Sequence, residues 1–138
     1  MNEAQNTQIV QDAYAAFLRR DIQSVLDTLD EAIVWQGVTG AGPQVPMRGL
    51  RRGKAQVADF FKSVAETVNF SRFEPREFVA QGDRVVALGH YAANITHGGA
   101  FDSDFVMVFK LRNGKVVEFQ EFLDSAALNA AFAGAAVA

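Results

Sequence analysis

The sequence predicts an α+β fold in which a curved β-sheet wraps over helices. Residues with helical periodicity fill most of the first half of the chain. Three consecutive strand-like runs, Arg84–Thr96, Phe101–Leu111 and Lys115–Leu123, fill most of the second half. Short turns rich in Gly and Asn join these runs, so neighbouring strands are expected to pair as antiparallel hairpins. Helices that are segregated from strands along the chain are typical of α+β proteins.

Length and composition indicate a globular protein with one core. The 138 residues are expected to form a single domain over residues 1–138. A net charge of −3 gives no basic footprint for nucleic acid or anionic lipid, so neither partner is expected. The absence of cysteine excludes disulfides and thiol nucleophiles. No run approaches the roughly 18 apolar residues of a membrane span, and the polar N-terminus shows no signal pattern, so a cytoplasmic location is expected.

Two amphipathic helices are predicted at the start of the chain. Apolar residues recur at helical spacing from Glu3 to Arg20, and Asn2 can cap the first turn. Asp21 occupies the N-cap position of a shorter second helix, whose apolar stripe ends before Asp30. We expect these two helices to meet at an angle.

A strand, a loop and a third helix follow. Residues Ala32–Val38 favour a strand that carries the only tryptophan, Trp35. Residues Thr39–Pro46 contain too much Gly and Pro for regular structure. Between Gly53 and Val68 the apolar residues follow the spacing of one helix face, which predicts an amphipathic helix.

The predicted sheet begins with the run Phe70–Ala80, which Pro75 interrupts. Because proline cannot donate a ladder hydrogen bond, this run is expected at a sheet edge or at a bulge. The pair Asn113-Gly114 predicts a two-residue type I′ turn, because both central positions of that turn need positive φ and these residues tolerate it. The last two strand-like runs are therefore expected to form a hairpin.

A final helix is predicted after the last strand. Asp124 or Ser125 can cap its first turn, and the helical pattern continues through Phe132. The Ala- and Gly-rich residues 133–138 are expected to fray, as chain ends commonly do. The sequence contains no internal repeat that would indicate a second domain.

Alternation along the last three strands predicts which side chains face the interior. Successive strand residues point to opposite faces of a sheet, and we expect the bulkier apolar set of each strand to face inward. This rule places His90 and Glu121 inward and Asp104 outward. The apolar residues expected around the inward pair are Leu88, Phe105, Met107, Phe109 and Phe119.

The inward pair is the predicted catalytic site. Removal from water raises the pKa of a carboxyl group toward the range in which it works as a general acid or base, so Glu121 is the predicted base. His90 titrates near neutral pH and can act as an acid, a base or a donor to a developing oxyanion. Two structural alternatives stay open: His90 is a satisfied core residue, or Glu121, near the end of its strand, reaches solvent.

Tyr14 and Trp35 are the predicted polar contributors to a substrate-binding wall. Both rings lie on otherwise apolar faces and carry a polar atom that needs a partner, so they line a pocket or pack in the core. The other histidine, His97, occupies a predicted hairpin tip and is expected to be exposed. Because no His and carboxylate cluster has metal-ligand spacing, we predict neither a metal nor another cofactor.

A series of short motifs covers almost the whole chain. They are Tyr14-Ala15-Ala16-Phe17, Asp21-Ile22, Val34-Trp35, Arg48-Gly49, Arg52-Gly53, Val57 with Phe60-Phe61, Gly82-Asp83-Arg84-Val85-Val86, Asn113-Gly114-Lys115-Val116 and Phe122-Leu123-Asp124. In this order and combination the chain resembles SnoaL-like members of the nuclear transport factor 2 superfamily. That superfamily also contains ketosteroid isomerases, polyketide cyclases and limonene epoxide hydrolases.

The resemblance implies a cone-shaped fold of the cystatin-like, nuclear transport factor 2-like type. Its curved mixed or antiparallel sheet would enclose a hydrophobic pocket, and such proteins usually form homodimers. Apolar residues on the second sheet face, Val106, Val108 and Phe122, also suggest a covered surface. A homodimer is therefore expected.

Catalytic residues of these families transfer only in part. The base of ketosteroid isomerases aligns near Gln36-Gly37, their oxyanion Asp near Met107 and their Tyr on Ala13, so steroid isomerisation by that mechanism is not expected. The Asp that epoxide hydrolases carry on the final strand falls on Glu121. Their Arg/Asp pair falls near His90, where no such pair exists.

The predicted function is a cofactor-free isomerase, cyclase or hydrolase for a small, largely apolar molecule, with Glu121 as base and His90 assisting. Two alternatives stay open, because this fold hosts enzymes and binding modules alike. One is a module that binds a small molecule without turnover. The other is a dimeric protein-interaction module whose pocket is filled by its own side chains.

Overall fold

Helices and strands alternate little along the chain, in agreement with the predicted α+β class. The computed structural model describes residues 2–137. Its helices are α1 (Glu3–Leu18), α2 (Ile22–Asp27), α3 (Lys54–Thr67) and α4 (Ser125–Val137). Its strands are β1 (Leu29–Gly37), β2 (Gly49–Arg52), β3 (Val68–Gln81), β4 (Arg84–Ile95), β5 (Ala100–Arg112) and β6 (Lys115–Leu123).

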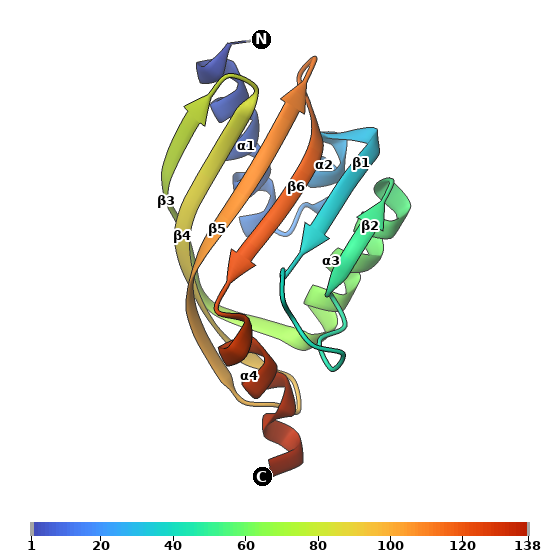
Figure 1. The fold of residues 1–138 in the computed structure, drawn as a ribbon, viewed down its shortest axis with the longest axis vertical. Helices are drawn as coiled ribbons and strands as arrows, with labels where there is room; N and C mark the ends of the chain where they lie inside the picture. Colours follow the sequence, from blue (N-terminus) through green and yellow to red (C-terminus); the bar gives the residue numbers. More distant parts are fainter. Residues whose placement is uncertain (1, 138) are drawn as a thin grey trace.

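One six-stranded sheet has the order β2-β1-β6-β5-β4-β3. β1 and β6 pair in parallel, and every other neighbouring pair is antiparallel. The sheet curves, α1, α2 and α3 lie behind it in the view of Figure 1, and α4 extends beyond its lower end. This arrangement confirms the predicted curved, mixed sheet over N-terminal helices, and it leaves the cone open rather than closed.

The two N-terminal helices begin where their caps were predicted. Asn2 accepts a hydrogen bond from the Gln5 backbone N–H at 2.8 Å, and the Gln5 side chain accepts one from the Asn2 N–H at 2.9 Å. This reciprocal pair is a capping box. Asp21 caps α2 by accepting from the Ser24 N–H. Among residues 2–137, no helix is both long and apolar enough to cross a membrane.

The edge strand β3 and the last hairpin also follow the sequence pattern. β3 lies at one edge of the sheet, and its pairing with β4 shifts between Pro75 and Glu77, as the proline predicted. Asn113 and Gly114 have φ values of 51° and 78° in the turn between β5 and β6. Both values are positive, as a type I′ turn requires.

Two elements differ from their predicted extent. The short strand β2 was not predicted, because a run of Gly, Leu and two Arg carries no strand pattern of its own; it forms by pairing with β1. Helix α4 continues to Val137, five residues beyond the predicted end at Phe132. Ala138, the last residue of the predicted frayed tail, lies outside the described residues.

The prediction that His90 and Leu88 face the interior is wrong. The buried residues of β4 are the alternate set, which includes Ala87, Gly89 and Tyr91, whereas Leu88 and His90 lie on the outer face. Gly89 faces inward at the point where the Phe105 ring fills the space under the strand. A Cβ atom at Gly89 would collide with that ring and with the Glu74 carbonyl. Side-chain bulk alone therefore selects the wrong face of β4.

We predict that Gly89→Ala lowers the free energy of unfolding by about 1–3 kcal/mol, because an added methyl group forces Phe105 or the edge strand to move. Urea denaturation of the variant and the wild type measures the change. Ala92→Gly, on the outer face of the same strand, is the control for altered strand propensity and should cost about 1 kcal/mol or less. An unchanged stability of Gly89→Ala would contradict the close approach.

Candidate functional site

An apolar cavity lies between the inner face of the sheet and helices α1 and α3. Its volume is about 90 Å³. Aromatic side chains supply most of its wall, and Glu121 is the carboxylate among them. The lining residues are Ala13, Tyr14, Phe17, Val25, Trp35, Phe60, Phe61, Val64, Phe70, Phe73, Tyr91, Met107, Phe109, Phe119 and Glu121.

Glu121 lies on β6 and is almost completely buried, with 5% of its surface exposed. One carboxylate oxygen, Oε1, accepts a hydrogen bond from the Val38 N–H at 3.2 Å. The other, Oε2, accepts from the Tyr91 hydroxyl at 3.2 Å. The Glu121 backbone carbonyl also accepts from the Thr39 N–H at 3.0 Å. The turn that follows β1 therefore holds both the main chain and the side chain of Glu121.

The Val38 conformation shows how this turn is built. Val38 has φ = 42°, which is unusual for a β-branched residue and carries strain. Its side chain is buried, so packing holds the residue in this conformation. The strained turn directs the Val38 N–H at the carboxylate of Glu121.

Burial raises the pKa of Glu121 above its ordinary value of 4.5. The loss of hydration is the largest cause, and it is opposed by the hydrogen bonds from Val38 and Tyr91, which favour the charged form. The predicted direction of the pKa shift is therefore confirmed. The alternative that Glu121 reaches solvent is wrong, because the residue is buried among the aromatic residues of the cavity although it lies two residues before the end of β6.

Two tyrosines bring hydroxyl groups to the same cavity. The Tyr14 hydroxyl donates to Met107 Sδ at 2.8 Å, and the Tyr91 hydroxyl donates to Glu121. Burial raises the pKa of both phenols, and the nearby charge of Glu121 raises them further. Both hydroxyls therefore stay protonated and act as donors. Tyr91 is not among the predicted site residues, because the alternation that places His90 inward places its neighbour Tyr91 on the outer face.

Trp35 contributes the one indole of the chain to the cavity wall. Its ring stacks on Phe119 with 3.7 Å between centroids, and 5% of the residue is exposed. The indole Nε1–H is buried and has no hydrogen-bond partner among the described residues. A buried donor without an acceptor is costly, so the indole N–H is free to bind an acceptor that comes within its reach.

The other predicted wall residues divide between two places. Met107, Phe109 and Phe119 line the cavity. Phe105 is buried just beside it and packs its ring on Tyr91 and Phe73. Leu88 lies on the outer face and is not among the lining residues.

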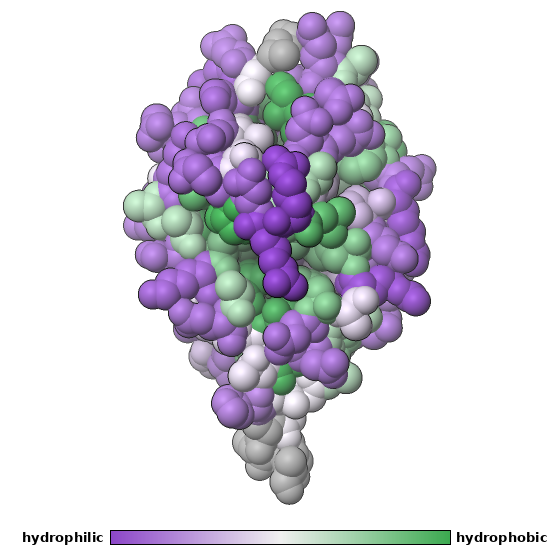
Figure 2. Space-filling model, turned by 180° about the vertical axis from the view of Figure 1, so that it is seen from behind, coloured by the Kyte–Doolittle hydropathy of each residue, from purple (hydrophilic) through white to green (hydrophobic). Residues whose placement is uncertain are grey.

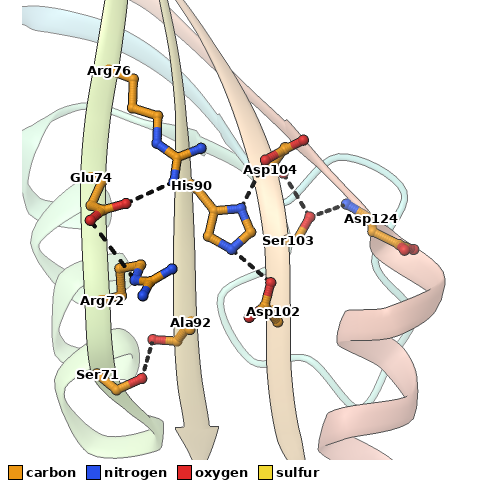
Figure 3. A network of polar contacts seen from close by, with 10 residues as sticks. All are labelled: Ser71, Arg72, Glu74, Arg76, His90, Ala92, Asp102, Ser103, Asp104 and Asp124. Atoms are coloured by element: carbon orange, nitrogen blue, oxygen red, sulfur yellow. Dashed lines mark hydrogen bonds and ion pairs between the residues drawn. The ribbon is translucent and has the colours of Figure 1, made fainter.

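His90 belongs to a polar network on the outer face of the sheet (Figure 3). Its Nε2 lies 2.6 Å from an oxygen of Asp102, and its Nδ1 lies 2.8 Å from an oxygen of Asp104. The hydrogen bond to Asp104 is the main reason why the pKa of His90 is raised. Both ring nitrogens thus face carboxylates, so His90 is suited to a charged, structural role away from the cavity. Asp104 faces outward, and His97 is exposed, as predicted.

The described residues also allow a check for metal ligands. Over residues 2–137, no group of three or more His, Cys, Asp or Glu side chains is arranged to hold a metal ion. The cavity that holds the Glu121 carboxylate is lined by two tyrosines, the indole of Trp35 and the thioether of Met107. These groups can bind and polarise an uncharged oxygen, and Glu121 can exchange a proton with it.

The curved sheet, the helices behind it and the carboxylate in the wall of an apolar cavity define a class of cone-shaped α+β proteins. Comparison with protein families shows which family within this class the chain belongs to. The SnoaL-like domain model matches residues 10–119, so the chain belongs to the SnoaL-like family. Comparison with curated proteins gives no match.

Solved structures of nuclear transport factor 2-like (NTF2-like) proteins share this fold. An NTF2-like protein from Burkholderia xenovorans LB400 is 34% identical, with a TM-score of 0.85 over 96% of this chain and 98% of that chain. TerC, co-crystallised with polyporic acid, is 29% identical, with a TM-score of 0.80 over 93% and 98% of the two chains. A candidate polyketide cyclase from Xanthomonas campestris, at 18% identity, shares the fold with a TM-score of 0.77 over 96% and 99%.

We predict that Glu121→Gln changes how stability depends on pH. Because the folded pKa of Glu121 is raised, its contribution is fully present below about pH 4.5 and is lost as the pH rises through the folded pKa. Relative to the glutamine variant, the wild type should lose about 1.4 kcal/mol per pH unit within that window. Urea denaturation between about pH 4 and about pH 8 measures the difference. A constant difference across the series would contradict a raised pKa.

Proposed function

We propose that the chain is a cofactor-free acid/base enzyme of the isomerase, cyclase or hydrolase type, acting on a small, largely apolar molecule. The observation that carries the proposal is the carboxylate of Glu121, buried in the wall of an aromatic cavity with a raised pKa. A carboxylate in such surroundings is a stronger base than one in water, and its pKa approaches the range in which proton transfer at neutral pH is efficient.

Glu121 is the base of the proposed reaction. It takes a proton from the substrate carbon next to a carbonyl, or from a hydroxyl or water, and returns it at a later step. The Trp35 Nε1–H and the Tyr14 hydroxyl donate to the substrate oxygen on which negative charge develops. Tyr14 gives up only a bond to a thioether when it does so, and sulfur is a weak acceptor. His90 has no part in this mechanism, because its ring lies on the outer face.

Non-catalytic binding is the second candidate function. Both Glu121 oxygens already accept hydrogen bonds, an arrangement that also suits a fixed acceptor for a ligand hydroxyl. TerC, which is 29% identical, was co-crystallised with a small molecule, polyporic acid. The cavity keeps about 90 Å³ of free volume, which disfavours the third candidate, an interaction module whose pocket is filled.

Hydrogen exchange tests catalysis without knowledge of the natural substrate. We expect the wild-type protein to accelerate exchange of α-hydrogens for deuterium in cyclohexanone, acetophenone or 2-indanone, followed by NMR in deuterated water. Glu121→Gln should reduce the rate by roughly 10²–10⁴-fold, the usual contribution of a general base.

Glu118→Gln is the matched control, because it makes the same change on an exposed residue of the same strand. Its rate should equal that of the wild type. Exchange that survives Glu121→Gln would remove Glu121 as base. Saturable binding of these ketones without accelerated exchange would instead favour the binding module.

We retain a cytoplasmic location as part of the proposal. We also propose a homodimer that forms through the outer face of the sheet. The face carries partly buried Val106 and Val108 beside Phe122, which is 39% exposed. Contiguous apolar surface of this kind is usually covered by a partner. His90 pairs with Asp104, which precedes Val106 on the same face of β5, so the His90 network borders this apolar surface on one side.

Phe122→Asp should convert the proposed dimer into a monomer, because two carboxylates would be buried against apolar side chains. Light scattering coupled to gel filtration measures the mass. Leu18→Asp places the same charge on an exposed apolar residue of α1 and should leave the dimer intact. A wild-type protein that stays monomeric at high concentration would refute the dimer.

A further inference from the structure

A groove on the helix side of the molecule adjoins the cavity. It has a volume of about 610 Å³ and lies between the end of α1, helices α2 and α3, and the start of β3. Figure 2 shows this side of the molecule, where hydrophobic surface surrounds strongly hydrophilic side chains near the middle. The groove and the cavity share Phe17, Phe61, Val64, Phe70 and Phe73 as wall residues. The two spaces are therefore neighbours, and a molecule that extends between these side chains would reach both.

The volume of the inner cavity requires such an arrangement. Its roughly 90 Å³ is less than the roughly 150 Å³ of an engineered apolar cavity that holds benzene. A ligand that reaches Glu121 and Trp35 with one end must leave the rest of its body between the aromatic residues of the groove. The ligand is therefore elongated and largely apolar.

The charges at the two ends of this path differ. Arg20 lines the groove, and its guanidinium forms no ion pair among the described residues, whereas its neighbour Arg19 pairs with Asp21 at 3.4 Å. Arg72 also borders the groove, but its guanidinium pairs with Glu74. Asn69 and Ser71 already donate to backbone carbonyls of β4. Arg20 is thus the groove cation that has no carboxylate partner among the described residues.

The inner end is suited to an oxygen without charge. Glu121 would repel an anionic group there, while Trp35 Nε1–H needs an acceptor and Tyr14 can supply a second donor. A carboxylate at the inner end is therefore unfavourable, and a carbonyl or hydroxyl is favourable.

From this arrangement we infer that the substrate is an elongated, largely apolar acid. Its uncharged oxygen enters the cavity at Glu121, and its carboxylate remains in the groove, where Arg20 binds it. This inference rests on the proposed function for the location of the site, and it adds the chemical class of the substrate and the residue that selects it. Arginine suits this role because its planar group forms paired hydrogen bonds with a carboxylate.

Binding of a matched pair of probes tests the inference. The probes are 3-(4-hydroxyphenyl)propanoate and its amide, which have the same shape and the same inner hydroxyl but differ in charge at the outer end. Trp35 is the only tryptophan in the chain and lies in the cavity wall, so its fluorescence reports binding directly. The wild type should bind the acid more tightly than the amide.

Arg20→Gln should weaken binding of the acid by about fivefold to tenfold, the effect of one partly exposed ion pair, and should change binding of the amide by less than about twofold. Arg112→Gln removes the same charge from an exposed residue at the β5–β6 hairpin and is the matched control. It should leave both affinities unchanged.

Salt gives a second measurement that needs no variant. Raising the concentration of sodium chloride from about 0.05 to about 0.5 M should weaken binding of the acid and spare the amide. Equal effects of Arg20→Gln on acid and amide, or no saturable fluorescence change with either probe, would overturn the inference. If Arg20 discriminates the probes but no hydrogen exchange is catalysed, the groove site stands and the enzyme proposal falls.

Discussion

The burial of one carboxylate is the constraint on which the rest of the site depends. Glu121 loses its hydration inside the cone, and an isolated charge in such a place is strongly unfavourable. Two donors from distant parts of the chain offset this loss: the Val38 N–H at the end of β1 and the Tyr91 hydroxyl on β4. The parallel pairing of β1 with β6 brings the first donor into place. The order of the strands in the sheet therefore determines which donors stabilise the buried carboxylate.

The aromatic residues provide the apolar surroundings in which Glu121 is buried. Tyr14 on α1 packs against Phe73, Phe105 and Phe109, which come from two strands. Trp35 packs on Phe60, Phe61 and Phe119, which come from α3 and β6. These ring contacts attach the helices to the sheet and surround the Glu121 carboxylate with apolar groups. A lower local polarity then strengthens every interaction made with Glu121.

Local signals predicted most of the fold and the inward orientation of Glu121, but not the outward orientation of His90. Caps at Asn2 and Asp21 and the turn at Asn113-Gly114 depend on the chemistry of a few neighbouring residues, so the sequence carried them directly. Glu121 shares the inner face of β6 with Phe119, and on this strand the face with the bulkier side chains is also the buried face. On β4 the face predicted from side-chain bulk is not the buried face, because the Phe105 ring occupies the space below Gly89. No pattern within β4 reveals a ring on the next strand. The strained Val38 and the unpaired Trp35 donor likewise depend on tertiary contacts.

The junction between α3 and β3 has a mechanical consequence. The helix ends at Thr67 and the strand begins at Val68, so no loop separates them, and residues on both sides of the junction form one wall of the groove. Rotation of α3 away from α1 would pull directly on the edge strand. The displaced strand could first change its pairing with β4 between Phe70 and Arg72, where the register is already irregular. A change in the width of the groove is thus coupled to a change in the pairing of β3 with β4, and the irregular pairing between Phe70 and Arg72 is where that pairing can adjust.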